Sequence, residues 1–149
     1  MLRSVLMGLV AGQRSMTPLA VLALAARRGD LPEDAPARNL LAHPAVVLGA
    51  AALAAGEMLG DKLPSAPDRI ILPGLVARSI TAAFAGAVLA PADRRAEAAV
   101  LTAVTALGAS YIGFSLRVRA MRQFGQASTG LVEDAIVLSS ALAIARQPG

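Results

Sequence analysis

Two short segments of the chain place an arginine beside hydroxyl side chains within long apolar runs. They share the order Arg-Ser-x-Thr, and their members are Arg14, Ser15 and Thr17 in the first segment and Arg78, Ser79 and Thr81 in the second. A charge at membrane depth costs roughly 2.5–3.5 kcal/mol on insertion scales, and such charges are commonly paired and functional. Guanidinium and hydroxyl groups together could bind an anionic group or hold carboxylates in place. The segments also form a weak internal repeat, with halves at about 1–66 and 70–149.

Four carboxylates and a lysine lie near the ends of other apolar runs. They are Glu57, Asp61, Lys62, Glu133 and Asp134. If successive spanning helices alternate in direction, these groups and both arginines converge on one half of the membrane, where ion pairing makes buried charges tolerable. The expected pairs are Arg14 with Glu57, and Arg78 with Asp61, Glu133 or Asp134. The sequence therefore predicts a polar cluster that could bind a cation or anion, or relay protons.

The composition is that of a chain solvated by lipid. Of its 149 residues, 56% are hydrophobic and only 16% are charged, whereas soluble domains carry about 25% charged residues. We therefore expect an all-α, polytopic transmembrane helix bundle that forms one integral-membrane domain over residues 1–149. The net charge is +4, but the basic residues lack the stripe and interleaved aromatic residues typical of nucleic-acid binding.

Several classes of chemistry have no support in the sequence. The chain has no cysteine and one histidine, which excludes thiol catalysis and argues against a histidine metal site. It has no nucleophile elbow or phosphate-binding loop. We therefore expect neither an enzyme nor a cofactor, with acid–base or metal-assisted chemistry on a lipid as the enzymatic alternative.

The apolar runs predict about five spanning helices. Their expected ranges are 4–26, 44–60, 71–90, 96–116 and 131–145, each near the length that crosses a bilayer. Pro18 is expected to kink or break the first helix. Short connections are expected at 64–69 and 91–95, a flexible turn at 125–130, and a loop or interfacial helix at 29–42. Four spans plus a re-entrant or interfacial segment is the alternative.

Small and basic residues add two further expectations. The pairs Gly8/Gly12 and Gly56/Gly60 have the spacing that lets membrane helices approach closely, so we expect the first two helices to pack together near the charges. Basic residues balance six to six between the two membrane sides, with the N-terminus weakly predicted to be cytoplasmic. The densest basic group is expected near lipid head groups and consists of Arg117, Arg119 and Arg122.

Four of these segments together resemble a known family. They are Gly-Gln-Arg-Ser-Met-Thr at 12–17, the stretch with Asp-Lys-Leu-Pro at 57–64, Pro-Gly-Leu-Val-Ala-Arg at 73–78, and Glu-Asp-Ala at 133–135. They resemble an uncharacterised family of small bacterial membrane proteins, domain-of-unknown-function family four-one-two-six, over nearly the whole chain. The resemblance implies a multi-span protein of the bacterial inner (cytoplasmic) membrane and implies no established activity.

Three functions fit these residues. The first is transport or conduction of a small ion or solute through the Arg/carboxylate/hydroxyl cluster, because repeats, proline-broken helices and midplane charges recur in transporters. A chain this small leaves little room for an enclosed path, which favours a homo-oligomer. The second is a non-transporting scaffold whose ion pairs only fix helix packing. The third is binding of lipid head groups.

Overall fold

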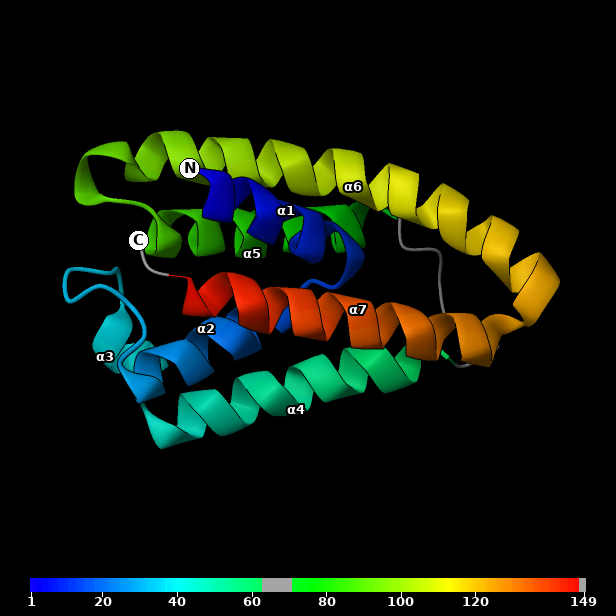
Figure 1. Cartoon of the computed structure of the whole chain (residues 1–149), viewed down its shortest axis with the longest axis horizontal. Helices are drawn as coiled ribbons and strands as arrows, with labels where there is room; N and C mark the ends of the chain where they lie inside the picture. The colour runs from blue at the N-terminus through cyan, green and yellow to red at the C-terminus, as the bar shows by residue number, and fades with distance from the viewer. Residues whose placement is uncertain (63–70, 148–149) are drawn as a thin grey trace.

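The chain is all-helical over the residues that the structure, a computed structural model, describes, which are 1–62 and 71–147. Those residues contain no strand (Figure 1). The elements are α1 (Leu2–Gln13), α2 (Met16–Arg28), α3 (Arg38–Leu41), α4 (Pro44–Gly60), α5 (Leu72–Leu89), η1 (Ala92–Arg94), α6 (Arg95–Phe124) and α7 (Gln126–Arg146). The expected helix bundle is confirmed. The connection expected at 64–69 lies outside the described residues.

The first apolar run is two helices rather than one. Arg14 is extended, with φ −141° and ψ 118°, and it separates α1 from α2. The break lies four residues before Pro18 because a proline cannot donate to the carbonyl at i−4 and its ring clashes with that carbonyl. Pro18 itself lies in the first turn of α2, where its missing N–H leaves no intrahelical bond unmade. The break that Pro18 was expected to cause in the helix over 4–26 is therefore confirmed, but it lies at Arg14 rather than at Pro18 and divides the run into two helices.

Helices α1 and α2 fold back on each other as a hairpin with Arg14 at its tip. The N-terminal end of α1 contacts the C-terminal end of α7, where the Arg3 guanidinium donates to the carbonyls of Ile144 and Ala145 at 3.3 Å. The C-terminal end of α2 also lies beside the C-terminal end of α7, where Arg28 and Arg146 line one shallow hollow. The start of α1 and the end of α7 consequently lie at one end of the bundle (Figure 1), which we call the terminal end. A single span over 4–26 would place Arg3 and Arg28 at opposite ends of the bundle, whereas the structure brings both to the C-terminal end of α7.

The described helices are compatible with a bundle that spans a membrane, and they do not confirm a count of five spans. Three segments are long and apolar enough to cross a bilayer, namely α5, the continuous η1–α6 segment and α7, and α4 is apolar but shorter. Helix α6 extends to Phe124 and α7 begins at Gln126, so the turn expected over 125–130 is confined to Gly125, whose φ is 81°. Residues 29–42 form a loop that contains the single turn of α3.

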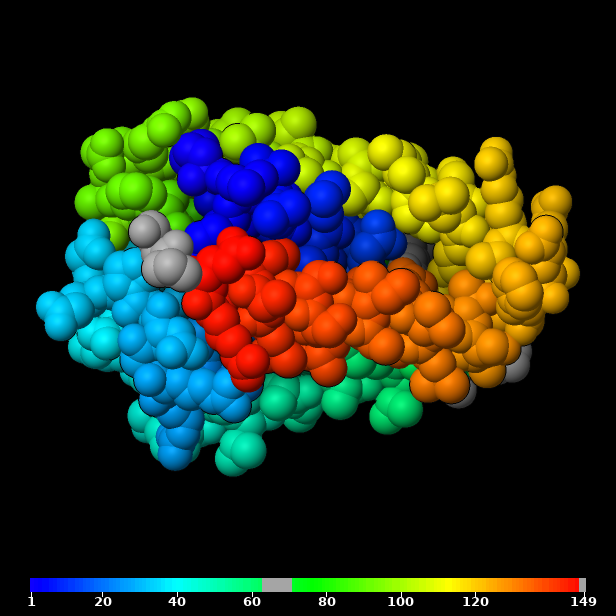
Figure 2. All heavy atoms as spheres, viewed as in Figure 1, coloured from blue at the N-terminus to red at the C-terminus, as the bar shows by residue number. Residues whose placement is uncertain are grey.

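Close approach between helices depends on glycine, but with a different partner from the one expected. A Cβ added at Gly8 would lie 2.7 Å from the Thr102 carbonyl oxygen, and one at Gly12 would lie 2.6 Å from that of Ala106. The first glycine pair thus packs α1 on α6 rather than on α4. Gly56 and Gly60 face open space, so the second pair makes no helix contact. The result is a face on which α1 lies between α6 and α7 (Figure 2).

Candidate functional site

Arg14 projects from the hairpin tip into contact with two carboxylates. Its Nε and Nη2 donate to Oδ1 of Asp134 at 2.9 and 2.5 Å, and its Nη1 donates to Oδ2 of Asp61. The side chain is 1% exposed. Asp61 follows the last residue of α4 and Asp134 lies two turns into α7, so one guanidinium joins three parts of the fold. Three of the groups that were expected to converge, Arg14, Asp61 and Asp134, are thus in direct contact.

Three further charged side chains complete the group. Arg117 Nη1 donates to Oδ2 of Asp61 at 2.7 Å and to Oε2 of Glu133 at 2.9 Å. Lys62 Nζ donates to Oδ2 of Asp134 and, at 2.8 Å, to the Met58 carbonyl. We call the six residues the charge cluster; they are Arg14, Asp61, Lys62, Arg117, Glu133 and Asp134. Among the described residues of the cluster, three cations face three anions, and such pairing is what makes buried charges tolerable.

The cluster has a deep side and a side nearer to solvent. Arg14 is 1% and Arg117 8% exposed, whereas the three carboxylates are 13–16% exposed and Lys62 is 19% exposed. Its ion pairs therefore lead from the buried tip of the hairpin outward, away from the terminal end. Asp61 and Asp134 each contact two cations, so each carboxylate would keep one cation if Arg14 were removed.

Glu57 satisfies the donors that the helix break exposes. Its Oε1 accepts from the backbone N–H and the hydroxyl of Ser15, both at 2.8 Å, and its Oε2 accepts from the N–H of Met16 at 2.9 Å. Unpaired N–H groups and the positive dipole end at a helix start favour a carboxylate there. The expected pair between Arg14 and Glu57 is therefore wrong, because Arg14 instead contacts Asp61 and Asp134.

The hydroxyl groups of the second segment bond to carbonyls of their own helix, and the second arginine is buried. Arg78 is buried, at 6% exposed, yet the ion pairs within the charge cluster are made without it. Ser79 Oγ donates to the Leu75 carbonyl at 2.8 Å, and Thr81 Oγ1 donates to that of Ala77 at 3.0 Å. Thr17 Oγ1 is buried without a hydrogen-bond partner in the described part of the chain.

Arg117 is the member of the cluster that the sequence analysis missed. It was assigned to a head-group region with Arg119 and Arg122, but it is buried whereas they are exposed. The signal was present in the topology argument, which places the end of the fourth apolar run on the same side as Asp61. The topology argument did not predict the length of α6. This helix continues for seven residues beyond Arg117, so Arg117 lies inside the bundle and not at its surface.

Comparison of the chain with protein-family models, with curated proteins and with solved structures gives no match. The resemblance to an uncharacterised bacterial membrane-protein family therefore stays a prediction. What the site can do follows from its own geometry. Its carboxylates are close to cations yet partly accessible, so they could exchange a proton or accept a small ion if the pairs rearranged.

Proposed function

We propose that the protein moves a small ion or solute across a bacterial inner membrane through the charge cluster. The observation that carries the proposal is the position of Arg14, which is 1% exposed at the tip of a broken helix and paired with Asp61 and Asp134. Broken helices that bring charged groups into the bundle interior recur at transporter sites. Protons and small cations are the favoured species, because the cluster holds three carboxylates that are 13–16% exposed.

Two features support this proposal. Thr17 Oγ1 is buried beside the helix break with no partner among the described residues, and such a group is normally satisfied by protein, water or an ion. The hairpin separates the cluster from the terminal end by α1, whose 12 residues span about 18 Å. An ion at the cluster would still have to cross this distance to reach the terminal end. An interface between copies of a homo-oligomer would supply that part of the path.

Proteoliposomes with an enclosed pH indicator test the proposal. A potassium gradient with valinomycin drives proton entry, and we expect the protein to raise the entry rate at least about tenfold over empty liposomes. Asp134→Asn should abolish that increase. The double variant Lys62→Gln/Asp134→Asn keeps the cluster neutral and should also be inactive while remaining folded. Glu97→Gln, at an exposed ion pair with Arg94, is the control that should retain the flux.

Sodium, potassium and chloride gradients extend the same assay to other ions. A wild-type protein that is folded, as judged by circular dichroism, and that moves none of the four ions would overturn ion transport. A flux that persists unchanged in both Asp134 variants would place the path elsewhere.

A scaffold function is the second candidate, favoured by the pairing of the cluster. Arg14 reaches two carboxylates and Arg117 reaches two, so these bonds alone tie the hairpin, α4, α6 and α7 together. If the ion pairs act only in packing, the cluster variants should lower the unfolding temperature and the wild type should show no flux. The liposome and unfolding experiments together separate the two functions.

A further inference from the structure

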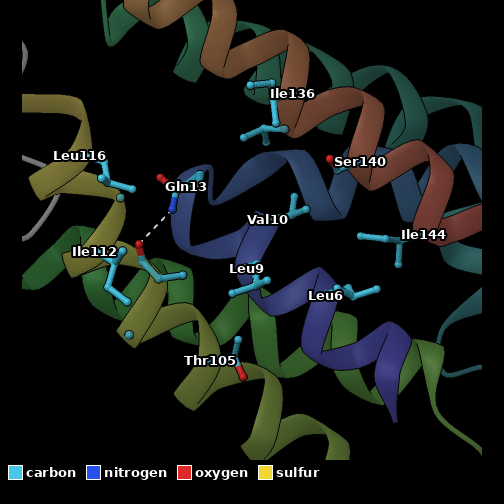
Figure 3. A pocket seen from close by; sticks show the side chains of 14 residues that line it. Leu6, Leu9, Val10, Gln13, Thr105, Ile112, Leu116, Ile136, Ser140 and Ile144 are labelled. Atoms are coloured by element: carbon cyan, nitrogen blue, oxygen red, sulfur yellow. Dashed lines mark hydrogen bonds between the residues drawn. The ribbon is translucent and has the colours of Figure 1, made fainter. Parts of the chain in front are cut away.

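An apolar groove follows α1 where it lies between α6 and α7 (Figure 3). Its volume is about 470 Å³. Figure 3 shows side chains from all three helices pointing toward it, among them Leu6, Leu9, Ile112, Ile136 and Ile144. The groove is thus a hollow on the side of the bundle whose walls are mainly aliphatic, with Gln13, Thr105 and Ser140 as the polar side chains.

The groove continues toward the charge cluster. A second hollow of about 320 Å³ shares Gln13, Leu116 and Ile136 with the first and reaches Arg117 and Glu133. Along α7 the two hollows extend from Ile144 to Thr129, which is about 22 Å at 1.5 Å per residue. One leaflet of a bilayer has about 15 Å of hydrocarbon, half of the ~30 Å core. The groove is therefore long enough for one acyl chain.

The two ends of the groove differ in charge. At the cluster end, Arg119 lies three residues after the lining residue Leu116 and so on the same face of α6. Arg119 and Arg122 are both exposed, and the described residues provide neither of them with an ion pair. Arg122 lies three residues after Arg119 and so beside it on α6, and an anionic group next to Arg119 would therefore gain the attraction of both guanidinium groups.

We propose that this groove holds one acyl chain of an anionic membrane phospholipid, with the phosphate beside Arg119 and Arg122. The exposed guanidinium groups at the cluster end favour a lipid with an anionic head group, and a helix from a second copy is the alternative that the test below distinguishes. The inference does not depend on ion movement, because it concerns the outer side of α1.

Gly108 allows the groove to be closed without touching the charge cluster. It lines the groove, and a Cβ added there meets nothing within 4 Å, so the side chain of Gly108→Leu would occupy the hollow. Gly49→Leu is the matched control, since Gly49 is also exposed within a helix and open to space. Both variants gain the same helix propensity. A difference in lipid binding between them therefore results from filling the groove.

The test uses proteoliposomes that contain phosphatidylglycerol with a photoreactive group on one acyl chain. We expect cross-linked peptides from α1, α6 and α7 at the groove, reduced about tenfold by Gly108→Leu and unchanged by Gly49→Leu. A phosphatidylcholine probe with the same chain should cross-link less, by about fivefold for each arginine. Arg119→Gln/Arg122→Gln should remove that preference while leaving phosphatidylcholine cross-linking unchanged.

Three outcomes would overturn the inference. Cross-links spread evenly over the exposed face of α4 would indicate ordinary bilayer contact. Equal yields in wild type and Gly108→Leu, with both proteins folded by circular dichroism, would show that the groove is not the binding place. A change of oligomeric state in Gly108→Leu alone, measured by light scattering, would assign the groove to a second copy. Ion flux in Gly108→Leu is read separately, so loss of lipid with retained flux leaves the proposed function standing.

Discussion

Arg14 and Lys62 both bind Asp134, but they differ in burial, and this difference predicts different costs of removal. Arg14→Met takes away the 1% exposed centre of the cluster, and breaking a buried pair costs about 3 kcal/mol of unfolding free energy. Lys62 is 19% exposed, so Lys62→Met should cost about 1 kcal/mol or less. Denaturant unfolding in detergent, followed by circular dichroism, measures both. Equal losses would mean that burial does not set the strength of these pairs.

Glu57 gives a second prediction at a single residue. Its carboxylate accepts three hydrogen bonds at the start of α2, and bonds to a charged group contribute about 1.5–3 kcal/mol each. Glu57→Gln keeps an acceptor but loses the charge, so we expect a loss of about 2 kcal/mol in unfolding free energy. Glu97→Gln, at an exposed pair with Arg94, should cost under about 0.5 kcal/mol. A Glu57 variant as stable as the Glu97 variant would contradict the capping role.

The sequence was sufficient to predict that some of these charges meet, but it missed Arg117 and did not predict how the charges pair. Arg14, Asp61 and Asp134 were predicted to converge, and they do. The direction of each helix decides convergence, and that direction follows from the order of the apolar runs. The partner of a charged side chain depends on the direction in which that side chain leaves the backbone. For Arg14 this direction is set by its extended conformation, which the sequence did not predict. Glu57 was assigned to the wrong partner for this reason.

Among the helices, the two copies of the Arg-Ser-x-Thr segment show how one residue changes an element. In the first copy the fourth residue after Arg14 is Pro18, and the helix breaks at Arg14. In the second copy the fourth residue after Arg78 is Ala82, and α5 continues through it. Ala82 has the N–H that a helix needs at that position and Pro18 does not. The repeat was visible in the sequence, but its two copies have different backbones.

Glycine pairs with the same spacing give opposite predictions on α1 and α4. Gly12→Ala would place a Cβ 2.6 Å from the Ala106 carbonyl oxygen, so α1 must move from α6 at a cost of about 1–3 kcal/mol. Gly56→Ala meets open space and should stabilise α4 by up to about 1 kcal/mol. The two unfolding temperatures should therefore shift in opposite directions. Two shifts of the same sign would contradict the close packing of α1 on α6.

Across the whole molecule, the hairpin redistributes the basic residues. Because Arg3 lies at the terminal end, that end carries seven basic residues, namely Arg3, Arg27, Arg28, Arg38, Arg94, Arg95 and Arg146. The described residues at the other end include four, namely Lys62, Arg117, Arg119 and Arg122. The even balance expected for five spans thus becomes an excess at the terminal end. We therefore predict that the terminal end faces the cytoplasm, since basic residues are enriched on that side.

Cysteine labelling separates the hairpin from five full spans. The chain has no native cysteine, so a membrane-impermeant maleimide reports only an introduced one. Suitable exposed positions are Leu2→Cys, Glu33→Cys and Gln123→Cys. If α1 and α2 form a hairpin whose ends both lie at the terminal end, the first two cysteines react from the same side and Gln123→Cys reacts from the other. A first apolar run that crosses fully would place Leu2→Cys opposite Glu33→Cys. In intact spheroplasts we expect only Gln123→Cys to react, and all three to react after lysis.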